Sequence, residues 1–371
     1  MLFSCAIVEQ EQKGMNLFMR KQILRLVCLL GVISLCLGLC GCSFGTNQTA
    51  KKASKSGFYF DTIISITLYG TDDTSEIDAC FALADTYEKK FSNTISDSEI
   101  SQINAKAGTG EYVTVSPETL ELLKAGIAYG DLSNGAFDIT IGKLTSLWNF
   151  SEISENAQSD TNEVDESVLP DETAIATLLS HVNYQNIEIQ ENAVRLNDAD
   201  AMIDLGGIAK GYVADKMREL LQKDGITQGI INLGGNVLTI GPKENGDDYV
   251  IGIQKPFAQA NETLGAVSLS DGSVVTSGIY QRYYRVNGTL YHHILDTATG
   301  YPCETSLNAV TIISPSSTDG DALSTICYVL GKDKGLELIE SLPDTEAIFV
   351  DTDNQTYVSS GFGETVTFTK E

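Results

Sequence analysis

The sequence predicts an α+β fold, a single domain of mixed sheets and helices behind a secretory leader. Apolar residues recur at helical spacing in several segments, such as 74–91. β-rich runs lie between these segments, and the run at 228–240 is broken by a Gly-Gly pair. The elements do not repeat as regular strand–helix–strand units, which favours α+β over a wound parallel sheet. The roughly 315 residues that follow the leader and a short tether suit one large domain.

Residues 1–41 are interpreted as a signal peptide. The basic stretch 19–21 precedes an uncharged apolar run, 26–39, which is too short to span a bilayer with flanks of its own. Gly41 before Cys42 fits a bacterial lipoprotein cleavage site, so Cys42 is expected to be the first mature residue and to carry lipid. The alternative is an uncleaved N-terminal anchor.

The same region predicts where the protein is located. Met15 or Met19 is a better start than Met1, because the first residues carry an acidic pair and no targeting features. Residues 42–56 are rich in Ser, Thr, Asn, Lys and Gly, which predicts a flexible lipidated tether and a domain over 57–371. We therefore expect a protein that is lipid-anchored to the cell membrane on its extracytoplasmic face.

Charge excludes one class of partner. The net charge is -26, and few basic clusters exist outside the leader, so no nucleic-acid partner is expected. Part of the negative charge is concentrated in one segment. Residues 151–172 form a polar acidic run that lacks apolar content, and they are predicted to be a solvated surface insertion.

The first half of the domain shows strand and helix signals in turn. Residues 58–70 alternate as a strand does, and 74–91 follow as an amphipathic helix. Ser116 and Pro117 indicate the start of the next helix, because Ser caps a helix and Pro fits its first turn. In the segment 134–148, NGAFDITIGKLTSLW, main-chain groups beside glycine are able to approach a ligand closely. A further helix is expected at 170–179.

Residues 203–217, IDLGGIAKGYVADKM, predict a glycine turn that leads into a helix over 212–222. The spacing fits neither GxGxxG nor GxxxxGK[ST], so the segment indicates an anion site without naming its ligand. After the run at 228–240, the segment 275–285 contributes several tyrosines. These tyrosines either stack on a planar ligand or pack across strands, which is the commoner use.

Two adjacent histidines lie in the segment LYHHILDTATGYP. Neighbouring side chains of a strand point to opposite faces, so only one of His292 and His293 faces a given pocket. Asp296 is three residues after His293, close enough to orient the ring of a general base. The alternative is a hydrogen-bonded histidine at the end of a strand, without a chemical role.

The segment DGDALSTICYVLG predicts a helix over 321–330 that ends at Gly331, before a last helix at 336–342. Asp321 and Thr325 are four residues apart at its start, so their oxygens project from one face. Such oxygens are suitable ligands for Mg²⁺. The alternative is an aspartate in a first helical turn and a threonine that faces the strands, and this segment alone favours that alternative.

Taken in order, seven segments resemble the ApbE family of FAD:protein FMN transferases, once called thiamine biosynthesis lipoproteins. The segments, from about Gly57 to Gly331, are FSNTISDSEISQIN, GAFDITIGKLTSLW, IDLGGIAKGYVADKM, INLGGNV, TSGIYQRYY, HILDTATGYP and DALST. The resemblance implies a one-domain, T-fold-like α+β fold that binds FAD and Mg²⁺. It also implies transfer of FMN from FAD to a Ser or Thr hydroxyl through a phosphoester, with release of AMP. The acceptors of this family are membrane-associated electron-transfer subunits with an FMN-binding domain.

The resemblance also implies roles for individual residues. Metal ligands fall on the side chains of Asp321 and Thr325 and on Gly207 through its carbonyl. His293 falls on the family's histidine before its D-P-x-T-G turn, and we take it as the base, with Asp296 as its partner. The positions that contact or border FAD are Phe60, Thr94, Ala136, Phe137, Asp138, Asp204, Lys210 and Leu295.

The sequence departs from the family pattern at several positions. Phe60 stands where Met is frequent, Thr94 where Tyr is frequent, and Ile279 where a polar residue is common. Thr297 replaces the usual Pro after Asp296, which is expected to loosen that turn.

Two other functions remain open. One is Mg²⁺-dependent hydrolysis of FAD to FMN and AMP at the same residues. The other is a flavin-binding lipoprotein without chemistry, which the presence of Asp321, Thr325 and His293 disfavours.

Overall fold

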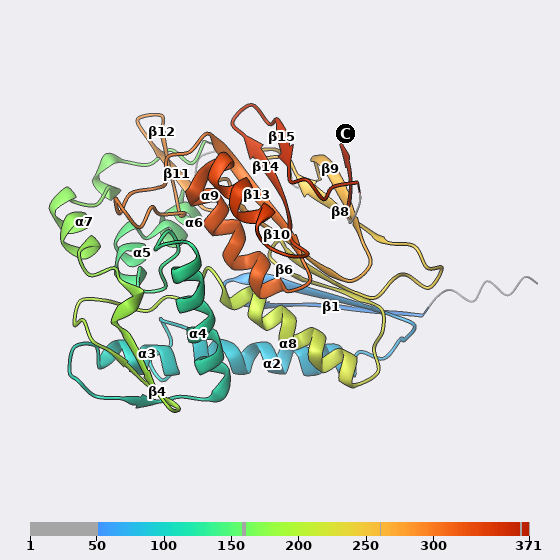
Figure 1. Cartoon of the computed structure of the whole chain (residues 1–371), viewed down its shortest axis with the longest axis horizontal. Helices are drawn as coiled ribbons and strands as arrows, with labels where there is room; N and C mark the ends of the chain where they lie inside the picture. The colour runs from blue at the N-terminus through green and yellow to red at the C-terminus, as the bar shows by residue number, and fades with distance from the viewer. Residues whose placement is uncertain (1–50, 158–160, 260, 364–365, 371) are drawn as a thin grey trace, which may run out of the picture. The chain divides into compact units, whose positions relative to one another are not determined.

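The computed structural model describes residues 51–157, 161–259, 261–363 and 366–370, and the predicted leader and Cys42 lie outside them. These residues confirm the α+β fold class. The main sheet has eight antiparallel strands in the order β1-β2-β6-β7-β10-β13-β14-β15 (Figure 1). Its strands are β1 (Lys52–Tyr59), β2 (Thr62–Tyr69), β6 (Gly229–Leu233), β7 (Asn236–Ile240), β10 (Gly272–Gly278), β13 (Leu307–Ser314), β14 (Glu346–Asp351) and β15 (Thr356–Val358).

Three smaller sheets surround the main one. Two are three-stranded, in the orders β16-β9-β8 and β3-β5-β4, and the third is the hairpin β11-β12. Their strands are β3 (Val113–Thr114), β4 (Ile187–Gln190), β5 (Ala193–Leu196), β8 (Tyr249–Gln254), β9 (Thr263–Leu269), β11 (Tyr283–Val286), β12 (Thr289–His292) and β16 (Thr367–Lys370).

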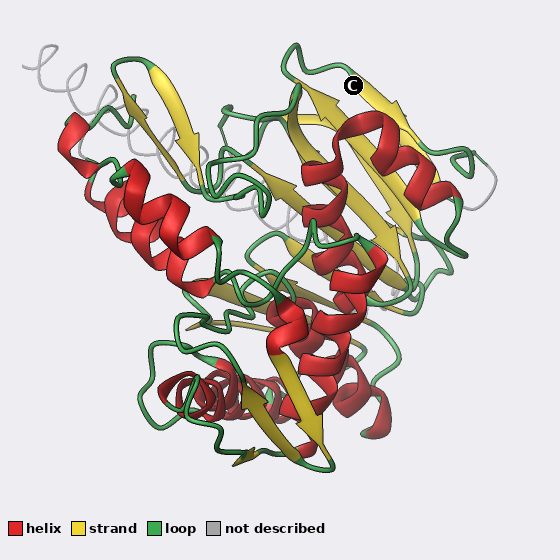
Figure 2. Ribbon diagram, turned by 60° about the vertical axis from the view of Figure 1, so that its left-hand side comes forward, coloured by secondary structure: helices red, strands yellow, loops and turns green. Residues whose placement is uncertain are grey.

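Helices pack on one face of the main sheet, and α9 runs along β10 and β13 with α8 beside it (Figures 1 and 2). Within the described residues, no helix is long and apolar enough to cross a membrane. The α-helices are α2 (Ser75–Phe91), α3 (Glu99–Ala105), α4 (Pro117–Leu132), α5 (Gly142–Trp148), α6 (Phe150–Asn156), α7 (Glu172–Leu179), α8 (Ala209–Lys223) and α9 (Ser317–Glu340), with 3₁₀ turns η1 (Glu166–Val168) and η2 (Tyr184–Asn186).

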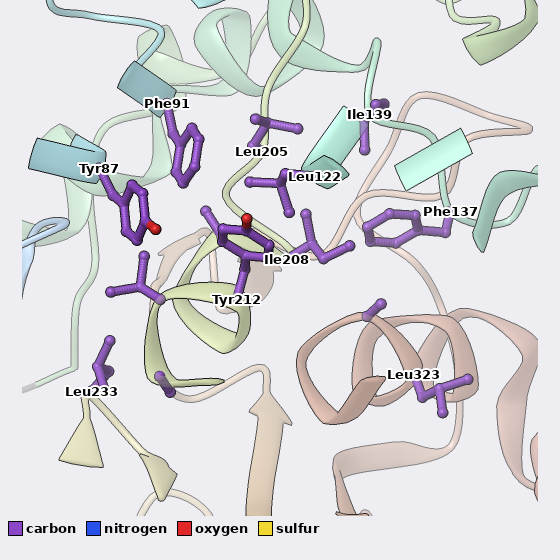
Figure 3. Close-up of a cluster of buried hydrophobic side chains, with 14 of the residues drawn as sticks. Tyr87, Phe91, Leu122, Phe137, Ile139, Leu205, Ile208, Tyr212, Leu233 and Leu323 are labelled. Carbon is purple, nitrogen blue, oxygen red and sulfur yellow. The ribbon is translucent and has the colours of Figure 1, made fainter. Parts of the chain in front are cut away.

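Both faces of β13 are buried. Val310 and Ile312 contribute to the core beneath the helices, whereas Ala309 and Ile313 contribute to a second core with β8 and β9. This alternation follows from the two-residue repeat of a strand, and it explains why the strand is a nearly continuous apolar run. The main core around Tyr212 joins side chains from α2, α4, α8 and α9 (Figure 3).

A separate aromatic cluster shows which of the two predicted uses applies to Tyr284. Tyr284 stacks on Phe150 with ring centroids 5.0 Å apart, and Phe150 stacks on Trp148 at 5.5 Å. Tyr291 lies across the β11-β12 hairpin from Tyr284 and stacks on it at 5.8 Å. Packing across strands is therefore the use of Tyr284.

The predicted tether boundary is wrong. Residues 52–56 form the first five residues of β1 and pair with β2, where the hydroxyl of Ser56 lies 2.7 Å from that of Ser65. The predicted single strand over 58–70 is instead a hairpin that turns at Phe60 and Asp61. The polar composition of 52–56 resembles a tether because β1 is an edge strand with one solvated face.

The acidic segment 151–172 also differs from its prediction, because parts of it pack. It contributes most of α6 and the turn η1, and the backbone of Val164 bonds Arg285 in β11. Its few apolar side chains suffice to contact the aromatic cluster, and these are Ile153, Val164, Val168 and Leu169. Residues 158–160 lie outside the described part.

The helices predicted at 321–330 and 336–342 are two halves of α9, which bends at Gly331, where φ is 74°. The helix starts at Ser317, so Asp321 lies in its second turn rather than at its start. The predicted helices 74–91 and 212–222 are confirmed as α2 and α8.

Helices α8 and α9 each provide a carboxylate that accepts amides in the first turn of the other helix. Asp215 of α8 accepts hydrogen bonds from the amides of Ser317 and Thr318, at 2.9 and 2.8 Å. In return, Asp321 of α9 accepts the amide of Gly211 at 2.9 Å. A Cβ at Gly211 would lie 2.2 Å from the Ser317 carbonyl oxygen, so only glycine permits this approach. Each carboxylate satisfies amides that a helix start leaves without partners.

Asp215→Ala is expected to lower the free energy of unfolding by about 2–3 kcal/mol, because buried amides of α9 lose a charged acceptor. Urea denaturation monitored by circular dichroism measures the change. Glu219→Ala is the matched control on the same helix, since its pair with Lys216 is exposed and is expected to contribute little. Equal stability of the two variants would contradict the capping role of Asp215.

Candidate active site

The glycine turn before α8 is held by one aspartate. Asp204 accepts the Gly206 amide at 2.8 Å through one carboxylate oxygen and the Thr145 hydroxyl at 2.9 Å through the other. Helix α8 then begins without a side-chain cap at Ile208. Asp321 supplies an acceptor for its first turn from outside the segment.

Asp321 is the buried carboxylate of the site, with 5% of its surface exposed. One oxygen is committed to the Gly211 amide. The other lies 3.6 Å from the Lys210 ammonium, which also donates to the Gly206 carbonyl at 3.1 Å. The carboxylate is thus fixed by a backbone bond while one oxygen faces a cation.

Thr325 lies one helical turn beyond Asp321, and its hydroxyl is 3.2 Å from that of Ser277 at the end of β10. Ser277 is also 2.7 Å from the hydroxyl of Ser324. These contacts orient the α9 face that carries both predicted metal ligands toward the end of β10. Sequence reasoning missed Ser277, although the TSG motif that contains it was a visible signal.

Gly207 completes the predicted donor set. Gly207 precedes the first residue of α8, and the Gly211 amide, which the start of the helix leaves without an intrahelical partner, donates to Asp321. No hydrogen bond of the described residues engages the Gly207 carbonyl. A carboxylate, a hydroxyl and a carbonyl oxygen are the hard donors that Mg²⁺ prefers, and an ammonium already faces Asp321, so the residues fit this ion.

The loop that holds the predicted FAD contacts Ala136, Phe137 and Asp138 is rigidly bonded. Asp138 is buried and accepts the Thr140 amide and hydroxyl at 2.7 and 2.6 Å and the Tyr184 amide at 2.8 Å. Burial raises the pKa of this carboxyl above its usual range, although these bonds oppose the rise. Its oxygens therefore shape the loop.

Phe137 points into the core near Ile208 and Leu323 (Figure 3). A Cβ placed on Gly207 would lie 3.0 Å from its ring. Beside the loop lies a cavity of about 240 Å³, whose lining includes Gly135, Asp138, Tyr184 and Thr297.

His293 is half-buried after β12 and is bound to one backbone oxygen. Its amide and its Nδ1 both contact the Arg282 carbonyl, at 3.1 and 3.2 Å. A carbonyl only accepts, so Nδ1 carries the proton and Nε2 keeps a free lone pair. Burial, together with the Arg282 cation, lowers the pKa of His293 to about 3, which keeps the ring neutral.

The predicted pairing of His293 with Asp296 is wrong. Asp296 accepts the Ala298 amide at 2.8 Å and the Thr299 hydroxyl at 3.3 Å, so its carboxylate holds the turn that follows. Among the hydrogen bonds of the described residues, none joins it to His293. The backbone of Arg282 takes the orienting role that the spacing assigned to Asp296.

Thr297 does not loosen this turn, contrary to expectation. Its hydroxyl donates to the Gly135 carbonyl at 2.6 Å, which ties the turn after His293 to the loop of Asp138. The backbone also closes the turn, since the Gly300 amide donates to the Asp296 carbonyl at 2.8 Å.

The remaining predicted FAD positions lie in three places. Leu295 is buried in the aromatic cluster. Phe60 lies in the β1-β2 turn, where its amide donates to Glu88 at 2.8 Å. Thr94 lies after α2 with its hydroxyl 3.0 Å from that of Ser92. No contact of the described residues joins Phe60 or Thr94 to Asp321.

His292 faces the opposite side from His293, as strand alternation predicts. Its Nε2 donates to the Cys303 carbonyl at 3.2 Å, and its Nδ1 accepts the Ile294 amide at 3.3 Å. Only the neutral ring satisfies both bonds. Burial lowers the pKa of His292 to about 4. His292 is therefore a hydrogen-bonded structural histidine, which the sequence allowed as an alternative.

This burial predicts a pH dependence of stability. The folded pKa of His292 lies below the unfolded value of about 6.5, so its contribution is full above pH 6.5 and is lost as the pH falls toward 4. We expect wild type to lose about 3 kcal/mol more than His292→Gln between pH 7 and 4. Urea titrations at several pH values measure the free energy of unfolding of both proteins. An equal loss in wild type and His292→Gln between pH 7 and 4 would exclude the effect.

Comparisons with known proteins agree with this geometry. The model of the ApbE family matches residues 60–349. An FAD:protein FMN transferase of Treponema pallidum (strain Nichols) is 31% identical over 349 residues, covering 88% of this chain and 92% of that protein. One from Klebsiella pneumoniae (strain 342) is 34% identical over 309 residues, covering 83% and 92%.

Solved structures are also similar. The ApbE protein from Thermotoga maritima MSB8 superposes with a TM-score of 0.73 at 32% identity, covering 84% of this chain and 98% of that one. The flavin transferase ApbE from Vibrio cholerae gives a TM-score of 0.72 at 26% identity, with the same coverage.

Proposed function

Because the chain belongs to the ApbE family, we propose that it moves the FMN half of FAD onto a Ser or Thr hydroxyl of an acceptor protein and releases AMP. The chain is a transferase. The observation that carries the proposal is that the chain has both of two features. One is the oxygen donor set of Asp321, Thr325 and Gly207, and the other is a neutral histidine with a free Nε2.

The proposed reaction is a displacement at the phosphorus of the FMN half. The acceptor hydroxyl oxygen forms a bond to that phosphorus, and the bond to the bridging oxygen breaks, so that oxygen leaves with AMP. Nε2 of His293 takes the hydroxyl proton, because Nδ1 is already protonated and bound to the Arg282 carbonyl. The tautomer is fixed before substrate arrives, which spares the cost of reorienting the ring.

Asp321, Thr325 and Gly207 are the residues proposed to hold Mg²⁺ when it is bound. The ion then neutralises charge on the diphosphate. The chain's own contribution is orientation. The Gly211 amide fixes the Asp321 carboxylate, and the Ser277 hydroxyl fixes that of Thr325.

We also propose that Cys42 carries lipid and that the domain works on the extracytoplasmic face of the membrane. The sequence of the leader supports this location. An acceptor with an FMN-binding domain in a membrane-associated electron-transfer subunit would then be on the same surface.

The transfer is tested with the domain, FAD, Mg²⁺ and purified FMN-binding acceptor domains. Mass spectrometry of the acceptor is expected to show the gain of one FMN on a Ser or Thr, with one AMP released for each. His293→Gln is expected to lower the rate at least 100-fold, because the hydroxyl loses its base. Free FMN and AMP with an unmodified acceptor would instead identify an FAD pyrophosphatase.

Asp321 has a metal role and a capping role, which two variants separate. Asp321→Asn keeps an acceptor for the Gly211 amide but loses the charge, so turnover is expected to fall at least 100-fold with little loss of stability. Asp321→Ala is expected to lose turnover and also about 1–2 kcal/mol of stability. AMP release measures turnover, thermal melts measure stability, and isothermal titration measures the affinity for Mg²⁺. Metal-dependent turnover by Asp321→Asn at the wild-type rate would remove Asp321 from the metal site.

A further inference from the structure

Arg282 lies on the short connection between β10 and β11, next to the proposed base. This connection is held at both ends of its turn. The Gln281 amide donates to the Gly278 carbonyl at 3.2 Å, and the Gln281 side chain donates to the Thr276 carbonyl at 3.3 Å. The Arg282 carbonyl then accepts both nitrogen contacts of His293. Its Cα is therefore placed firmly at the site.

The guanidinium of Arg282 has no protein partner. Within the described part of the chain, no hydrogen bond or ion pair uses it, although the side chain is half-buried. Two other cations of this strongly acidic chain do have partners. Arg218 pairs with Asp215 at 3.0 Å, and Lys210 lies 3.6 Å from Asp321. The Arg282 guanidinium therefore keeps its hydrogen-bond donors available to an anionic ligand.

Arg282 also acts on the site electrostatically. Its charge and that of Lys210 both help to lower the pKa of His293, so two cations converge on an uncharged ring. Lys210 is already engaged with Asp321 and the Gly206 carbonyl. Arg282 is therefore the cation of this cluster that remains available to an anion.

We propose that the guanidinium of Arg282 binds the diphosphate of FAD directly. This inference rests on the proposed function, because it takes FAD as the substrate. Guanidinium binds phosphate oxygens through two parallel N–H donors, which orients the group as well as neutralising it. From this position Arg282 would hold the diphosphate against Nε2 of His293, while its own carbonyl fixes the tautomer of that ring.

The test measures equilibrium binding in the presence of Mg²⁺, by isothermal titration with ADP and with FAD and by fluorescence with riboflavin, which has no phosphate. Arg282→Met is expected to weaken ADP and FAD about 10- to 100-fold and to leave riboflavin unchanged, and Arg282→Lys is expected to be intermediate. Arg285→Met is the matched control, because Arg285 lies three residues further on and its side chain bonds the hairpin carbonyl of Gly288. Its affinities are expected to equal those of wild type.

Two outcomes would overturn the inference alone. One is wild-type affinity of Arg282→Met for ADP and FAD. The other is an equal loss of ADP, FAD and riboflavin, which would show that Arg282 only supports the fold. If the wild-type protein bound no FAD with Mg²⁺ present, the proposed function itself would fail.

Discussion

The exchange of carboxylates between α8 and α9 is the constraint on which the site depends. Two helices that start side by side bring together partial positive charges and unpaired amides, which repel unless anions lie between them. Asp215 and Asp321 supply those anions reciprocally. Because each helix takes a charged acceptor for its first turn from the other, the first turn of α8 and the second turn of α9 keep a fixed distance.

A consequence is that one of the proposed metal donors is also a capping group. The Gly211 amide, which the helix start leaves unpaired, bonds Asp321, and no hydrogen bond of the described residues engages the Gly207 carbonyl. The same bond fixes Asp321 so that its second oxygen faces Lys210. A device that stabilises two helix ends thus also presents the oxygens that would hold Mg²⁺, and the fold and the site share one set of contacts.

Sequence periodicity predicted the fold class, helices α2 and α8, and the common face of Asp321 and Thr325, because these depend on local repeats. The partner of His293 could not be predicted this way. Any residue can offer a backbone carbonyl, so nothing marks Arg282, whereas Asp296 at three residues looks suitable. The edge strand at 52–56 was missed for a related reason, since its stability comes from pairing with β2.

The pKa of His293 depends on the charges of its neighbours. A base with a pKa of about 3 accepts a proton weakly, and the causes are burial first and then the charge of Arg282. In the proposed complex, a diphosphate bound to Arg282 would offset that charge and so raise the pKa of the ring. The proton affinity of Nε2 would then be higher with the substrate bound than without it, which would couple the strength of the base to the substrate that needs it.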